Sequence, residues 1–143
     1  MFERILLAVD GSDESREAIR TAIDLAKTSN GEILVVHVHG KDMGFQVKDD
    51  VETRVEAQML IEAACDLVKK ADVPVVGDLR SARVDKVADQ IVAAAADYRA
   101  DCIVVGSRGA GPVTEMFLGS VANRVVHLAR CPVVVAKPLA RAA

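Results

Sequence analysis

Three glycines and a serine in the last third of the chain have the spacing of a loop that holds phosphate. Two residues separate Gly106 from Gly109, and nine more lead to Gly119 and Ser120. Glycine lets the backbone approach a ligand closely and adopt positive φ. The first N–H groups of a helix have no partner inside it, and the helix dipole adds partial positive charge there. A helix that starts after these glycines would therefore complete a phosphate site.

The residues around the glycines predict the elements that would position them. Residues 102–105 form a short apolar run, typical of a strand buried on both faces. Ser120 is the expected N-cap of the following helix, and its hydroxyl could also face a phosphate oxygen. Apolar side chains then return at helical spacing, and we expect one face of this helix to carry Val121, Val125, Leu128 and Ala129.

Asp10 is the candidate carboxylate for the same site. It follows a second apolar run, residues 5–9, and open α/β sheets bind ligands outside the carboxyl ends of their parallel strands. It would contact a nucleotide by a hydrogen bond or through bound Mg²⁺ or Mn²⁺. Asp10 could instead cap the next helix, and the two roles can coexist. Ser12 or Asp13 is the other expected cap of that helix.

Other reactive side chains do not assemble into a catalytic set. His37 and His39 alternate on one strand face, but without a third ligand a structural role is favoured over a metal site. His127 has no evident catalytic partner. The phosphate-loop lysine of the common NTPases is missing from the sequence. We therefore expect a nucleotide binder without efficient turnover.

Strands and helices alternate along the chain. Strands are expected at residues 5–9, 33–38, 73–76, 102–105 and 131–136, with helices between them. This alternation predicts one doubly wound parallel α/β sheet with helices on both faces. Pro74 cannot donate to a ladder, so its strand is expected at an edge. Residues 40–50 lack periodicity and are expected to form a loop.

Two helices in the middle of the chain have expected core residues. The helix at residues 51–71 is expected to bury five apolar side chains that recur at helical spacing: Val55, Met59, Ala63, Leu67 and Val68. The next helix is expected to carry six apolar residues: Val84, Val87, Ala88, Ile91, Val92 and Ala95.

Composition limits the function classes. The 143 residues are 51 % hydrophobic but only 3 % aromatic, which predicts an aliphatic core in one domain, residues 1–138, with a short tail at 139–143. The net charge of −3 gives no general attraction to nucleic acid or anionic membrane. Three cysteines without scaffold spacing are typical of a reducing cytoplasm.

These motifs together resemble the ATP-binding branch of the universal stress protein family. The resemblance covers residues 2–138 and is carried by the glycine spacing and by three segments: residues 5–12, 101–106 and 131–135. It implies a Rossmann-like, adenine nucleotide alpha hydrolase-like fold with strand order 3-2-1-4-5 and a ligand cleft between strands one and four. It also implies ATP, ADP or AMP as ligand, with Mg²⁺ or Mn²⁺.

The same resemblance implies particular contacts. Val9 and Val38 would border the adenine, with Ala8 and Ser12 close by. The residues that flank the glycine spacing, carried over on position alone, are Val105, Arg108, Val121 and Ala122.

Residues 133–135 form an uninterrupted apolar strand. In strand order 3-2-1-4-5 it lies at an edge, which invites pairing with another chain. The resemblance implies a homodimer through this strand, acting in the cytoplasm as a regulator or sensor of stress. Two alternatives remain open: a stress-response interaction protein that binds no nucleotide, and a slow ATPase. The resemblance implies at most slow ATP hydrolysis or autophosphorylation, which some members of the family are credited with. The sequence identifies no partner protein.

Overall fold

The computed structural model of the chain describes residues 2–41, 47–107 and 118–138, with side chains for all of these except residues 41 and 47–53. Strands and helices alternate as expected. In chain order the elements are β1 (Arg4–Ala8), α1 (Asp13–Ser29), β2 (Glu32–Lys41), α2 (Val47–Lys70), β3 (Val75–Arg83), η1 (Val84–Lys86), α3 (Val87–Tyr98), β4 (Cys102–Gly106), α4 (Ser120–Leu128) and β5 (Val133–Ala136).

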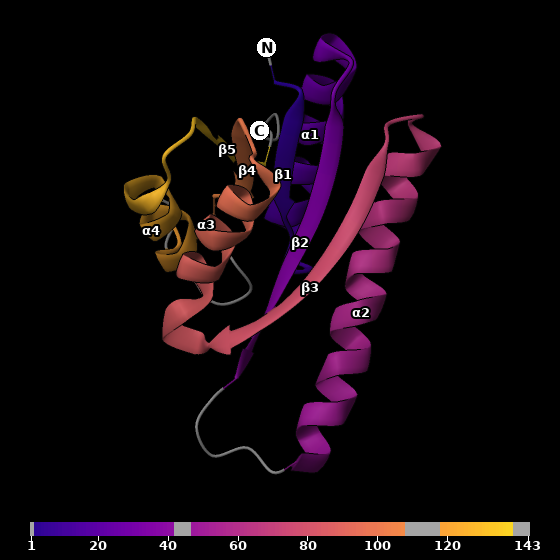
Figure 1. Cartoon of the computed structure of the whole chain (residues 1–143). Coiled ribbons are helices and arrows are strands. Elements are labelled where there is room, and N and C mark those ends of the chain that lie inside the picture. The colour runs from indigo at the N-terminus through magenta and orange to yellow at the C-terminus, as the bar shows by residue number, and fades with distance from the viewer. Residues whose placement is uncertain (1, 42–46, 108–117, 139–143) are drawn as a thin grey trace, which may run out of the picture.

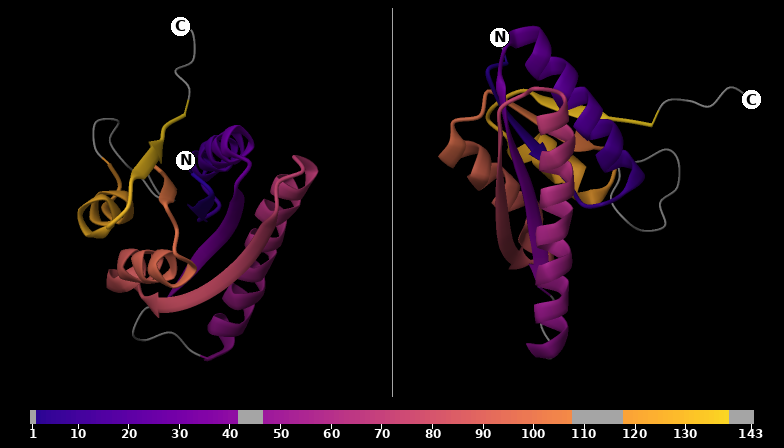
Figure 2. Two further views of the ribbon diagram at one scale, coloured as in Figure 1. Left: turned by 45° about the horizontal axis from the view of Figure 1, so that its top comes forward. Right: turned by 90° about the vertical axis from the view of Figure 1, so that its right-hand side faces the viewer.

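The five strands form one parallel sheet in the order β3-β2-β1-β4-β5 (Figure 1). Helices α1 and α2 cover one face, and α3 and α4 cover the other (Figure 2). The predicted fold class and strand order are confirmed. Among the described helices, none combines the length and apolarity that crossing a membrane requires.

β1 is the centre of the sheet and of both core layers. Successive side chains of a strand point to opposite faces, so Ile5 and Leu7 pack under α1 and α2 while Leu6 packs under α3 and α4. All three are fully buried. Because both faces are covered, the strand reads as a continuous apolar run rather than as alternating residues. Its carboxyl end lies between β2 and β4.

The third strand is longer than predicted. It runs from Val75 to Arg83 rather than over residues 73–76, and it lies at a sheet edge as Pro74 indicated. Pro74 immediately precedes it, and its carbonyl accepts a hydrogen bond from the Ile33 amide at 2.9 Å. The second half of β3 was not recognised in the sequence because it contains polar residues, which an edge strand tolerates. Arg80, for example, forms an ion pair with Asp78 at 2.8 Å.

Other predicted boundaries also shift. β2 continues to Lys41, and α2 already begins at Val47, so the expected loop at residues 40–50 is shorter; residues 42–46 lie outside the described part. β5 begins at Val133 rather than at residue 131. Val84 does not belong to α3 but to the separate 3₁₀ turn η1, with an exposed side chain.

The buried face of α2 was predicted wrongly. Of the expected core residues only Val68 is buried, whereas Val55, Met59, Ala63 and Leu67 are exposed. The helix instead buries Ala57, Ile61, Ala64 and Val68. α2 carries two apolar stripes on opposite faces, and the spacing alone cannot show which one faces the sheet.

The pH dependence of stability should reveal the buried thiol of Cys102. Burial, with smaller effects of Cys131 and Asp101, raises the pKa of this thiol from 9.0 to about 11. The raised pKa stabilises the fold fully below pH 9, and this contribution is lost as pH rises through 11. One pKa unit corresponds to about 1.4 kcal/mol. Between pH 8 and 10 the free energy of unfolding of the wild type should therefore fall by about 1.4 kcal/mol more than that of Cys102→Ala.

Urea titrations of both proteins at the two pH values measure this difference. Tyr98, whose pKa burial and Glu32 raise to about 12, contributes equally to both proteins and cancels. Parallel pH profiles would contradict the prediction.

Candidate functional site

The carboxyl ends of β1 and β4 border a pocket that encloses about 540 Å³, part of it open to solvent. The chain leaves β1 through α1 on one face of the sheet and reaches β4 through α3 on the other, so a crevice forms between the two strands. Its lining consists of Ala8, Val9, Asp10, Ser15, Val36, His37, Val38, Val87, Ile91, Val105, Gly106, Val121 and Ala122.

Most of the predicted site residues lie in this pocket. Those that line it are Ala8, Val9, Asp10, Val38, Val105, Gly106, Val121 and Ala122. Ser12 lies beside the pocket, bonded to Asp10. Gly119 and Ser120 start α4 without lining the pocket, and Arg108 and Gly109 lie outside the described residues.

Five lining residues were missed: Ser15, Val36, His37, Val87 and Ile91. Three of them could have been found from their spacing in the sequence. Val36 precedes Val38 by two residues and therefore shares its face of β2, and Val87 and Ile91 lie four apart on one face of α3. No sequence pattern indicated Ser15 and His37, because their positions depend on hydrogen bonds to other segments.

Asp10 is bound into the turn before α1 through one of its oxygens. Its Oδ1 accepts hydrogen bonds from the Ser12 amide (3.0 Å), the Ser12 hydroxyl and the Ser15 hydroxyl (2.7 Å). The Asp10 amide in turn donates to Ser15 Oγ at 2.8 Å. Among the described residues no hydrogen-bond partner is found for Oδ2 of this exposed carboxylate. Asp10 therefore shapes the turn and still offers one oxygen to a ligand.

Ser12 is the N-cap of α1, one of the two predicted caps. Its Oγ accepts from the Ser15 amide at 3.2 Å and donates to Asp10. Because the hydroxyl both donates and accepts within the turn, Ser12 acts on the site by fixing Asp10.

His37 links β2 to Val9, the residue that follows β1. Its Nδ1 lies 2.7 Å from the carbonyl oxygen of Val9. A carbonyl only accepts, so Nδ1 of His37 donates this hydrogen bond. In the described part of the chain no three His, Cys, Asp or Glu side chains group as metal ligands do.

Gly106 allows α1 to approach β4. A Cβ at this position would lie 2.8 Å from Cβ and 2.9 Å from the backbone carbon of Glu14, closer than real side chains come. The first glycine of the predicted spacing therefore lets the first turn of α1, with Asp10 and Ser15, lie against β4. Gly106 also lines the pocket.

α4 starts at the pocket without a side-chain cap. Gly119, not Ser120 as predicted, is its N-cap, because the carbonyl of Gly119 accepts the first helical bond, from the Asn123 amide at 2.9 Å. The N–H groups of Ser120, Val121 and Ala122 therefore have no partner inside the helix.

The buried face of α4 also differs from the prediction. Ala122 and Val125 are buried, whereas Val121 and Leu128 are partly exposed. In this orientation Val121 lines the pocket and Arg124 forms an ion pair with Asp89 of α3 at 3.3 Å.

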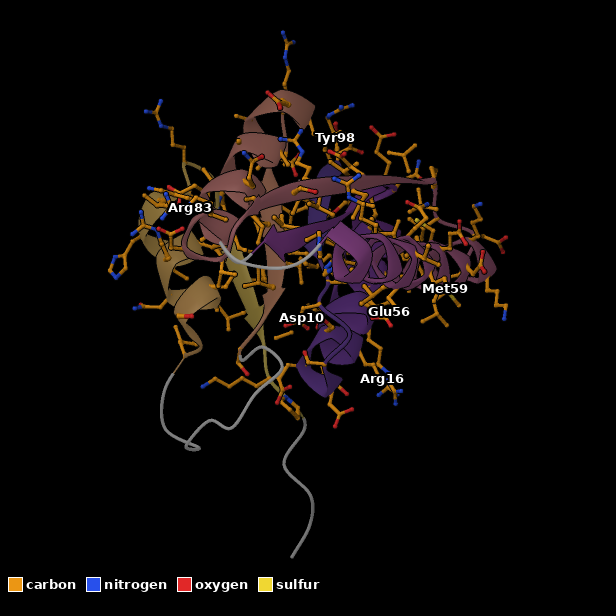
Figure 3. The ribbon with its side chains drawn as sticks, turned by 90° about the horizontal axis from the view of Figure 1, so that it is seen from below. Asp10, Arg16, Glu56, Met59, Arg83 and Tyr98 are labelled. Carbon is orange, nitrogen blue, oxygen red and sulfur yellow. The ribbon has the colours of Figure 1, made fainter. Side chains whose placement is uncertain are left out.

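Figure 3 shows Asp10 beside the start of α1, at the end of the sheet where the pocket lies. The pocket thus combines aliphatic walls, a carboxylate oxygen and the positive end of a helix. Such a site suits a flat apolar ring that carries an anionic group.

Ser15→Ala tests the network around Asp10. Ser15 is buried, and its hydroxyl makes two hydrogen bonds to Asp10. Its removal leaves the Asp10 amide without its partner and should lower the free energy of unfolding by about 1–3 kcal/mol. Ser81→Ala, at an exposed position of β3, is the matched control and should stay within about 0.5 kcal/mol of the wild type. Equal stabilities of the two variants in urea would contradict the network.

Comparisons with known proteins agree with this arrangement. The model of the "Universal stress protein family" matches residues 1–137. The Bacillus subtilis universal stress protein YxiE is 30 % identical over 149 residues, covering 96 % of this chain and 100 % of that protein. A universal stress protein of Archaeoglobus fulgidus superposes with a TM-score of 0.78 at 26 % identity, over 96 % of this chain and 100 % of that one. A structure of the universal stress protein from that organism in complex with dAMP gives 0.73 at 25 % identity, over 96 % and 98 %. The chain belongs to the universal stress protein family.

Proposed function

We propose that this protein binds an adenine nucleotide, foremost ATP, in the pocket between β1 and β4. One observation carries the proposal: a single pocket combines aliphatic side chains from β1, β2, α3, β4 and α4 with Asp10 and with the start of α4, which has no side-chain cap. The Archaeoglobus fulgidus relative in complex with dAMP supports adenine as the base.

The base would lie among the aliphatic side chains. Val9 and Val38 are nearly fully buried and border the pocket from β1 and β2, and Ile91 borders it from α3. These walls would replace water around the two faces of the ring. Val9, directly after β1, is fixed to the middle of β2, because its amide donates to the Val36 carbonyl at 3.0 Å and His37 donates to its carbonyl. The cavity for the base would therefore be preformed.

The phosphates would lie toward the glycine-rich side. The N–H groups at the start of α4, next to Val121 and Ala122, would face them. Arg108 and Gly109 remain proposed contacts on the strength of their spacing alone, as do Gly119 and Ser120. Oδ2 of Asp10 would bind a ribose hydroxyl or a divalent cation. A single carboxylate suits Mg²⁺ or Mn²⁺, because the nucleotide phosphates and water supply the remaining ligands.

The proposed role is regulatory, in the cytoplasm, with binding rather than rapid turnover. The three cysteines are free thiols, as a reducing compartment maintains. We also propose a homodimer through β5, since Val133–Ala136 lies at the sheet edge opposite β3 and its outer side has no strand neighbour among the described residues.

A thermal-shift panel of ATP, ADP, AMP and GTP, each with and without Mg²⁺ or Mn²⁺, tests the proposed ligand. A ligand at a hundred times its Kd stabilises the fold by about 2.7 kcal/mol, which raises the Tm of a domain of this size by roughly 5–10 °C. ATP should reach this shift and GTP should not. No difference between ATP, GTP and buffer would overturn the proposal.

A further inference from the structure

The outward face of α2 carries an apolar stripe that the fold leaves exposed. We define the α2 stripe as Val55, Met59, Ala63 and Leu67, which recur every four residues. The exposed fractions of Val55, Met59 and Leu67 are 56 %, 62 % and 49 %, and Ala63 is exposed as well. Figure 3 shows Met59 and Glu56 on the side of α2 away from β3. Four exposed apolar side chains in one row form a contiguous patch, which indicates an interaction surface more strongly than scattered single residues do.

The charges beside the α2 stripe are balanced and ordered along the helix. Residues 54–70 contain three carboxylates and three cations, the first of which is Arg54. The carboxylates are Glu56, Glu62 and Asp66, and two of the cations, Lys69 and Lys70, stand in the last turn. A strongly charged partner, such as nucleic acid or an anionic membrane, finds no net charge to attract it here. A second α2 running in the opposite direction does find a complement, because its basic last turn can lie beside Glu56 of the first.

We propose that two copies of this chain pair through the α2 stripe, antiparallel about a two-fold axis near Ala63. This axis places Met59 opposite Leu67 of the second copy, and Glu56 opposite Lys70 of the second copy. A row of residues spaced by four is the ridge used in the commonest helix packing, with axes crossing at about −50° and 8–10 Å apart. The small side chain of Ala63 at the crossing point permits that distance. The antiparallel order also opposes the two helix dipoles favourably.

This interface is independent of the nucleotide pocket and of β5. α2 covers β2 and β3 (Figure 1), at the sheet edge opposite β5. The two self-pairing surfaces can therefore coexist, and chains that use both would form assemblies larger than a dimer. No residue of the α2 stripe lines the pocket, so failure of one proposal leaves the other standing.

Cross-linking of the full-length chain tests the axis directly. In Ala63→Cys the two introduced thiols lie on either side of the axis, and a short bismaleimide should join most chains into a species of about 30 kDa, twice the 15.2 kDa of one chain. Gln58→Cys is the matched control, exposed on the same helix but turned away from the α2 stripe. Neither this variant nor the wild type with its own three cysteines should cross-link to that extent. Equal cross-linking of all three proteins would overturn the proposal.

Light scattering gives the second measurement. The double variant Met59→Glu, Leu67→Glu should lower the mass found for the wild type at micromolar concentration by a factor of at least about two. The control, Val76→Glu with Val84→Glu, alters two similarly exposed residues outside α2 and should leave the mass unchanged. A wild type of one-chain mass, or a double variant of wild-type mass, would overturn the α2 interface. If the wild type and the double variant both have the mass of a dimer, β5 remains as the interface.

Discussion

Gly106→Ala is expected to lower the free energy of unfolding by about 1–3 kcal/mol, the usual cost of forcing an atom into a filled site. The added Cβ would meet Glu14 at 2.8 Å, and its backbone carbon and oxygen at 2.9 and 3.0 Å. Backbone atoms cannot rotate away, so the first turn of α1 must shift relative to β4. Since Asp10 and Ser15 are bonded within that turn, nucleotide affinity should fall too.

Gly40→Ala is the matched control. A Cβ there meets its nearest neighbour, Val84 Cγ2, at an ordinary 3.4 Å. Its stability should stay within about 0.5 kcal/mol of the wild type. Urea denaturation of both variants measures the contrast. If Gly106→Ala is as stable as Gly40→Ala, the close approach of α1 to β4 is wrong.

Val121→Glu should weaken ATP binding about 30-fold. A carboxylate about 8 Å from a phosphate charge costs on the order of 2 kcal/mol at an effective dielectric constant of 20. The fold should tolerate the change, because Val121 is 37 % exposed and a carboxylate near a helix N-terminus is favourable. Adenosine, which lacks phosphate, should keep a larger share of its affinity than ATP does.

Val126→Glu supplies the matched control for this effect. Val126 lies on the same helix, is 43 % exposed and does not line the pocket. Titration calorimetry of ATP should give wild-type affinity for this variant. Equal losses in the two variants would mean that α4 does not approach the phosphates.

The fold and much of the pocket could be predicted because their signals are local. The apolar runs of β1 and β4 determine both buried strands, and Asp10 directly follows the first of them. The alternation of elements then brings these two carboxyl ends together. Gly106 was found from its spacing, although in the structure it also serves the contact with α1.

What was missed depends on contacts between distant segments. Both apolar stripes of α2 have helical spacing, and packing against β2 and β3 selects Ile61 over Met59. Ser15 is a pocket residue because the turn folds it back onto Asp10. Gly119 replaces Ser120 as the cap of α4 because its amide donates to Ser107 at 2.8 Å, which fixes where the helix begins.

Intermolecular NOEs between ATP and the methyl groups of the protein test the central claim most directly. With the adenine in the pocket, its H2 and H8 protons should show NOEs to the methyls of Val38 on β2 and Ile91 on α3, which both line the pocket. The methyls of Ala93 and Ala96 belong to a separate groove beside Arg99 and serve as the internal control. NOEs to these alanines, or none at all at millimolar ATP, would contradict nucleotide binding between β1 and β4.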